Sequence, residues 1–178
     1  GVVYWVGVVA ADDWANENLD EVLVVDATPM SNVAGVGQPP PRVEGLSAWD
    51  HPADDGTAID IVWNRSLAAD FSHYVIWVSD YPLNDLTEIW AECSDDLAAC
   101  GLLEIDQRQI GGALQLQLTV TTALYGSTIT TLSSEPITPS IPLYVTITTH
   151  DIRGNVHLTG MEEHMVLVSP LDNRGDIS

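Results

Sequence analysis

Residues 58–80 read AIDIVWNRSLAADFSHYVIWVSD, two alternating apolar runs with a short polar break between them. In the first run, Ile61 and Trp63 share one face, which is the period-two pattern of a half-buried strand. In the second run, apolar residues stand on both faces, with Tyr74 on one and Trp77 on the other. Both runs therefore predict β-strands, and the second predicts a strand whose two faces are both apolar.

Shorter runs of the same kind lie on either side of this stretch, and no segment of useful length has helical periodicity. Turn residues separate the runs at spacings of roughly 10–15 residues, which is typical of an all-β sandwich. The predicted strands lie at 2–10, 21–28, 43–49, 58–66, 71–80, 86–93, 102–107, 113–124 and 165–170, with one more opening the segment 143–158.

Part of the chain occurs twice. Residues 4–19 (YWVGVVAADDWANENL) and 143–158 (LYVTITTHDIRGNVHL) align at an offset of about 139, and a second strand follows each copy. We therefore expect residues 1–30 to be the last two strands of another sandwich, either a preceding domain or one completed in trans. Two strands alone are not stable, so this pair needs a partner.

The domain organisation follows from that repeat. A Gly- and Pro-rich segment at 31–41 predicts a semi-rigid linker. The complete sandwich is expected at 42–171, with an extended 80–142 region, and residues 172–178 read as a tail or linker.

The net charge of −21, from 26 acids against five arginines and no lysine, excludes several classes of partner. Nucleic acids and anionic membrane surfaces need a cationic protein face. No apolar run approaches the ~18 residues that a membrane-spanning helix requires, so no membrane insertion is expected. The acidity is interpreted as solubility in a salty or acidic medium, or as a supply of calcium ligands, and the two are compatible.

The two cysteines, Cys93 and Cys100, enclose six residues. The spacing favours a disulfide across a loop over a redox pair or a zinc site, with two free thiols as the alternative. A bridge of this size stabilises by roughly 2–3 kcal/mol and indicates an oxidising compartment outside the cytosol.

Aspartate and asparagine side chains in turns are the candidate metal ligands, and Ca²⁺ is the candidate cofactor. The alternative is turn chemistry, in which these side chains bond their own backbone. The candidates are Asp50, Asp54 and Asp55 in one turn and the pairs Asp12 with Asn16 and Asp151 with Asn155. Three of the histidines stand seven residues apart, at 150, 157 and 164, but on different elements this spacing predicts no metal site.

The order of these strands resembles a fibronectin type III domain, an immunoglobulin-like antiparallel β-sandwich. The resemblance rests on VEGLSAWD after the prolines, IDIVWNRS, SHYVIWVSD and LYVTITTHDIRGN. It implies Trp63 and Tyr74 as inward core anchors, and Tyr4 at the position of the family's tyrosine corner. In the second copy Leu143 takes that position, and Tyr144 is expected to face the other way.

No catalytic motif is present, so we expect no enzyme. The repeat predicts an extracellular or cell-surface structural or adhesive module, in a tandem array or a strand-complemented filament, with other copies of itself or neighbouring sandwich domains bound through residues 1–30. The alternative is a carbohydrate- or protein-binding accessory module of a larger secreted enzyme. It rests on tryptophans outside the core, Trp77 among them, and on the long 80–142 region.

Overall fold

The computed structural model describes most of the chain and divides it into two compact units, Gly1–Gly35 and Val36–Ser178. In the first unit, β1 (Tyr4–Val8) pairs antiparallel with β2 (Leu23–Ala27). The residues that the structure describes are 4–8, 23–27, 38–106, 114–125 and 132–175.

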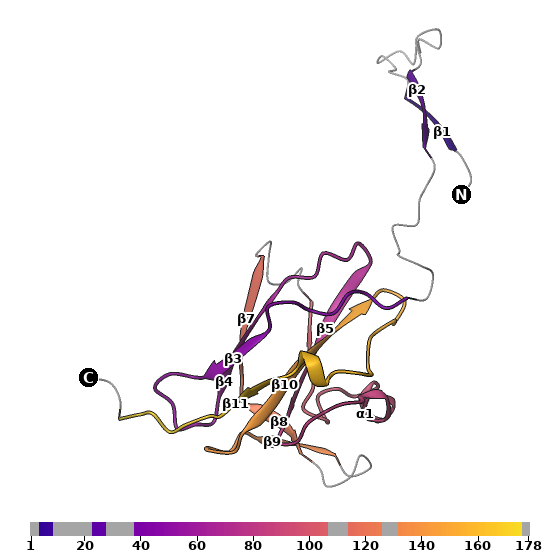
Figure 1. Cartoon of the computed structure of the whole chain (residues 1–178). Coiled ribbons are helices and arrows are strands. Elements are labelled where there is room, and N and C mark those ends of the chain that lie inside the picture. The colour runs from indigo at the N-terminus through magenta and orange to yellow at the C-terminus, as the bar shows by residue number, and fades with distance from the viewer. Residues whose placement is uncertain (1–3, 9–22, 28–37, 107–113, 126–131, 176–178) are drawn as a thin grey trace, which may run out of the picture. The chain divides into compact units, whose positions relative to one another are not determined.

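The second unit contains two sheets (Figure 1). The three-stranded sheet has the order β3-β4-β7, formed by β3 (Ser47–Asp50), β4 (Ile59–Asn64) and β7 (Gln115–Val120). The six-stranded sheet has the order β11-β10-β5-β8-β9, with β6 also paired to β5. Its strands are β5 (Phe71–Ser79), β6 (Leu103–Ile105), β8 (Thr122–Tyr125), β9 (Ser133–Pro136), β10 (Leu143–Asp151) and β11 (Val166–Val168).

A hydrophobic core lies between the sheets, as the alternating patterns predict. Trp63 on β4 and Tyr74 on β5 are both fully buried there, and their rings meet edge to face with centroids 5.5 Å apart. Ile59 and Ile61 of β4 and Ile147 of β10 belong to the same cluster. The all-β class and the packing of two sheets are therefore confirmed.

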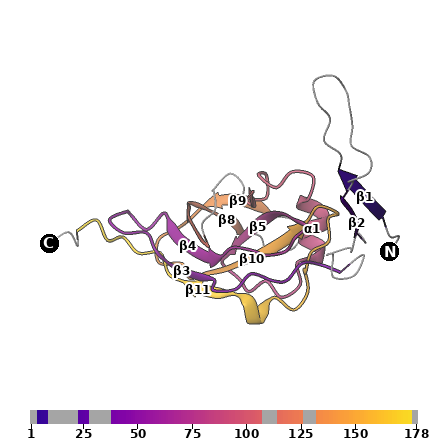
Figure 2. The same cartoon turned by 90° about the horizontal axis from the view of Figure 1, so that it is seen from above.

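A second core lies on the other face of the six-stranded sheet, where a short helix, α1 (Thr87–Cys93), covers β5 (Figures 1 and 2). Val75 and Trp77 of β5 are fully buried against it. The prediction of a strand at 86–93 was wrong. Leu86, Ile89 and Cys93 are spaced three and four apart, so a helix places all three on one face, where they join this second cluster.

Two predicted strands have different limits. The expected strand at 113–124 ends at Val120, and the chain crosses to the other sheet, where β8 begins at Thr122. β8 meets β5 in parallel through a single pair, Ser79 with Leu124.

The first strand of the sandwich is also shorter than predicted, because residues 43–46 lie outside β3. Gly45 has a φ of +66°, and a Cβ there would lie 2.7 Å from the side-chain nitrogen of Asn64. Only glycine combines that backbone conformation with so close an approach. The positive φ interrupts the extended run before Ser47.

Trp63 provides a direct test of the inter-sheet core. We expect Trp63→Ala to lower the free energy of unfolding by about 3–5 kcal/mol, because the cavity left between the sheets cannot close fully. Trp49→Ala is the matched control, since Trp49 is 39% exposed on β3, and it should cost about 1 kcal/mol or less. Urea denaturation of both variants measures the difference, and equal losses would contradict this placement of the core.

Candidate functional site

The structure joins Cys93 and Cys100 in a disulfide with an S–S distance of 2.08 Å. Cys93 is the last residue of α1 and is buried, while Cys100 lies in the turn that leads into β6. The backbone amide of Leu102 donates to the carbonyl of Leu97 at 2.9 Å within the same loop. The disulfide therefore holds the helix and its following turn together over the second core.

The acidic turn after β3 uses its carboxylates to order its own backbone. Asp54 accepts hydrogen bonds from the amides of Gly56 and Ala58, both at 2.9 Å. Asp50 accepts from the amide of Leu171 at 2.8 Å and from the side-chain nitrogen of Asn173 at 2.7 Å. Of the predicted residues, Asp54 and Asp55 thus lie in this turn and Asp50 ends β3 just before it, and their bonds tie the turn to the segment after β11.

The pair Asp151 and Asn155 shows the same turn chemistry. Asp151 accepts from the backbone amides of Arg153 and Asn155, both at 2.8 Å, and from the side chain of Asn155 at 2.7 Å. Asp12 and Asn16 lie outside the described residues. Across the described parts of the chain, no three His, Cys, Asp or Glu side chains are grouped so that they could hold a metal ion.

The core anchors also have defined roles. The backbone amide of Ser66 donates a hydrogen bond to the hydroxyl oxygen of Tyr74, which links the β4–β5 connection to β5. Leu143 is buried in the inter-sheet core, and Tyr144 is only half-buried. Tyr4 lies in β1, and its side chain is outside what the structure describes.

Trp77 does not offer the ligand-binding surface that its position opposite the inter-sheet core suggested. Its ring is fully buried, and its indole N–H donates to the hydroxyl of Thr148 at 3.0 Å. Trp90 of α1 is half-buried above it, with ring centroids 6.2 Å apart. The period-two pattern identifies a strand's two faces, but it does not show that a helix covers the second one.

Trp49 is exposed, and it belongs to a polar row on the outer face of the three-stranded sheet. Trp49 of β3, Asp60 of β4 and Thr119 of β7 stand directly opposite one another across the three strands. Asp60 accepts from the hydroxyl of Thr119 at 2.6 Å and contacts Nδ1 of His51 at 3.0 Å. Gln117 of β7 is exposed in the next row. Asp60 is itself buried, so the surface presents an aromatic ring beside an exposed hydroxyl and amide, which suits a hydrogen-bonding ligand.

A histidine pair, of which His150 is buried and His73 half-buried, lies under α1 and was not indicated by the sequence. His73 of β5 and His150 of β10 are opposite each other and stack with ring centroids 4.6 Å apart. Nε2 of His150 lies 2.9 Å from the hydroxyl of Thr148, and the ring of Trp90 covers it. Burial, with a smaller contribution from His73, lowers the pKa of His150 to about 3. Both rings are therefore neutral near pH 7, because burial also lowers the pKa of His73.

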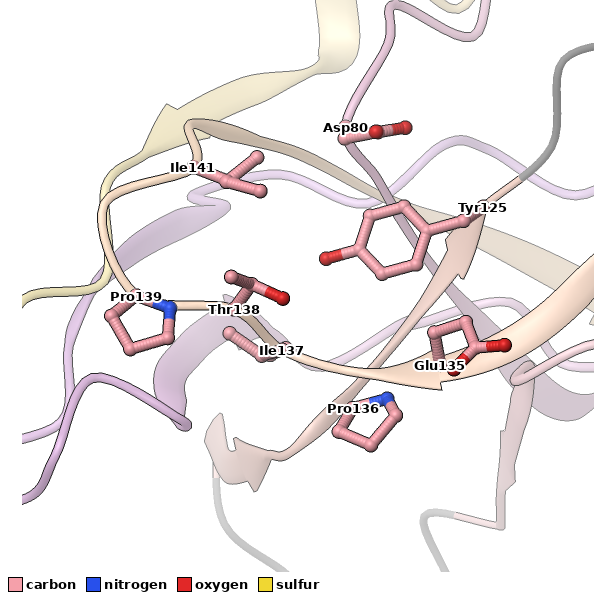
Figure 3. A pocket seen from close by; sticks show the side chains of 8 residues that line it. All are labelled: Asp80, Tyr125, Glu135, Pro136, Ile137, Thr138, Pro139 and Ile141. Atoms are coloured by element: carbon pink, nitrogen blue, oxygen red, sulfur yellow. The ribbon is translucent and has the colours of Figure 1, made fainter.

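One cavity of about 420 Å³ lies beside the β8–β9 hairpin (Figure 3). Figure 3 shows the side chain of Tyr125 pointing into it between Asp80 and Thr138. Burial raises the pKa of Tyr125, and the carboxylates of Asp80 and Glu135 raise it further. A neutral phenol flanked by two carboxylates disfavours an anionic ligand in this cavity.

The histidine pair predicts a pH-dependent stability. Unfolded His150 binds a proton below a pH of about 6.5, whereas the folded form does so only near 3, so stability falls as the pH decreases through this window. Between about pH 7.5 and 5.5, the free energy of unfolding of the wild type decreases, and we expect this decrease to be smaller by about 1.4 kcal/mol in His150→Gln. Urea titrations at both pH values measure this, repeated in high salt to screen the surface charges. Equal losses in the two proteins would contradict the assignment.

Among the described residues, no helix combines the length and the apolar content that crossing a bilayer requires. None of the protein-family models scanned matches this chain, and no curated protein matches its sequence significantly.

Proposed function

We propose that this chain is an extracellular structural module of the fibronectin type III kind, which connects copies of itself or neighbouring domains end to end. The strand order supports the fold type. When the β8–β9 hairpin is set aside, the described part of the second unit has seven strands. The first, second and fifth of them (β3, β4 and β7) form one sheet, and the seventh, sixth, third and fourth (β11, β10, β5 and β6) form the other. Seven strands divided three against four between two sheets are typical of immunoglobulin-like sandwiches.

The observation that carries the connecting role is the strand pair of the first unit. β1 pairs with β2 as β10 pairs with β11, and the repeat-equivalent residues Tyr4 and Leu143 stand at the same end of the two ladders. A two-stranded sheet has too little buried surface to be stable alone. It gains that surface by completing another sandwich.

Charge and the disulfide support the location. A net charge of −21 keeps an extracellular protein soluble in salt, and a disulfide persists in an oxidising compartment. We assign no catalytic reaction to the module.

Self-association of the full chain tests this function. We expect sedimentation to show assembly that increases with protein concentration up to about 1 mM. Neighbouring domains in a tandem array meet at an effective concentration of this order. Val25 pairs with Val6 in the first unit, and Val25→Pro should abolish assembly because proline cannot donate to the ladder. Val25→Thr, which favours a strand, is the control and should assemble normally. A wild-type monomer at every concentration, with residues 1–35 rapidly proteolysed, would contradict the proposal.

The row containing Trp49 supports a second candidate, the binding of a flat, neutral polysaccharide chain. The exposed indole would stack on a sugar ring, while the exposed side chains of Thr119 and Gln117 would bond its hydroxyls.

Electrophoresis through gels that contain hydroxyethyl cellulose or xylan tests this candidate. The wild type should be retarded, and Trp49→Ala should migrate freely. Leu167→Ala, at another exposed apolar residue, is the control and should be retarded like the wild type. No retardation of the wild type in either gel would reject polysaccharide binding.

A further inference from the structure

A groove of about 530 Å³ lies at the end of the sandwich where the chain enters it. It is formed by the segment before β3, the β4–β5 connection and the residue before β7. Its lining combines apolar side chains with two arginines and one glutamate, and includes Arg42, Glu44, Arg65, Leu67, Ala68 and Leu114. We call this end the N-terminal pole.

Arg65 is the unusual residue in this groove. The chain has 26 acids and five Lys and Arg together, yet the Arg65 guanidinium has no hydrogen-bond or ion-pair partner among the described residues, and its Nε is buried. Arg42, by contrast, donates to the carbonyl of Thr159 at 2.8 Å. A half-buried cation without a partner is costly, so the groove is suited to an anionic group that would pair with Arg65.

The rim of the groove is apolar and open. Leu67 is 86% exposed and Leu114 is 79% exposed, the two highest values among the exposed large apolar side chains of the described residues. Both line the groove beside Arg65. The occupant should therefore carry an apolar side chain next to a carboxylate.

The opposite end of the sandwich carries such a pair. Leu171, 51% exposed, precedes Asp172, whose side chain is half exposed beside Asp55. We call this end the C-terminal pole. β4 starts beside this pole and ends at the groove, so the two sites lie roughly 17 Å apart or more along the strand direction. Figures 1 and 2 both show the described chain entering and leaving the sandwich at opposite ends.

We propose that the groove at the N-terminal pole binds the C-terminal pole of another copy of this chain, with Asp172 pairing with Arg65 and Leu171 packing between Leu67 and Leu114. The Asp172–Arg174 pair within one copy is exposed, so it stabilises little and exchanges readily. The contact joins two different surfaces, so it repeats head to tail without closing. This inference rests on the proposed connecting function and adds a second contact to the one made by the strand pair of the first unit.

Charge reversal tests the contact in the full chain by sedimentation at about 30 mM and about 0.5 M salt. Arg65→Glu and Asp172→Arg should each weaken self-association by about tenfold or more, because each places like charges together. An equimolar mixture of the two variants, and the double variant, should both recover it. Leu67→Ser should weaken association without changing charge. Arg153→Glu makes the same charge change at an exposed residue outside the groove, and should leave association unchanged.

The outcomes separate this inference from the function on which it rests. Association that Val25→Pro abolishes but that Arg65→Glu and Leu67→Ser leave intact would overturn the groove contact alone. Weakening by Arg65→Glu and Arg153→Glu alike, without recovery in the mixture, would show a general charge effect and would also overturn it. A wild-type chain that stays monomeric at every concentration and salt would overturn both.

Discussion

The second unit depends on β5, a strand that is buried on both faces. Residues 74–79 of β5 are consecutively buried, with Tyr74 and Ile76 facing one core and Val75 and Trp77 facing the other. A strand of this kind must be covered twice. The three-stranded sheet covers the first face, and α1 with its disulfide loop covers the second. The region between residues 80 and 102 is therefore part of the fold and not a loop added to it.

The second core contains buried polar groups that are paired with one another. Thr148 bonds Trp77 and His150, and the hydroxyl of Thr146 donates to the carbonyl of His164 at 3.2 Å. Such groups cost free energy when they are buried without partners. The bond from Thr146 therefore fixes how the segment before β11 lies on the sheet, because a shifted segment would leave this buried hydroxyl unpaired.

The sequence was sufficient for the strands with strict alternation and insufficient for what covers them. Ile61 and Trp63 identified β4, and the apolar face of β10 was predicted equally well. The helix was missed, although the spacing of Leu86, Ile89 and Cys93 contains its signal, because seven residues give a weak periodicity. The stacking of His73 on His150 could not be predicted, because it depends on the register between strands that lie more than 70 residues apart.

Residues 38 and 175 lie at opposite ends of the sandwich, and this placement has a mechanical consequence. A pulling force transmitted from residue 38 to residue 175 acts along the strands, and the bonds of antiparallel ladders run across them. The three register pairs between β10 and β11 are then loaded in shear and resist together. With both ends at one pole, the same force would open these ladders one bond at a time. The geometry therefore favours a link that stays folded under tension.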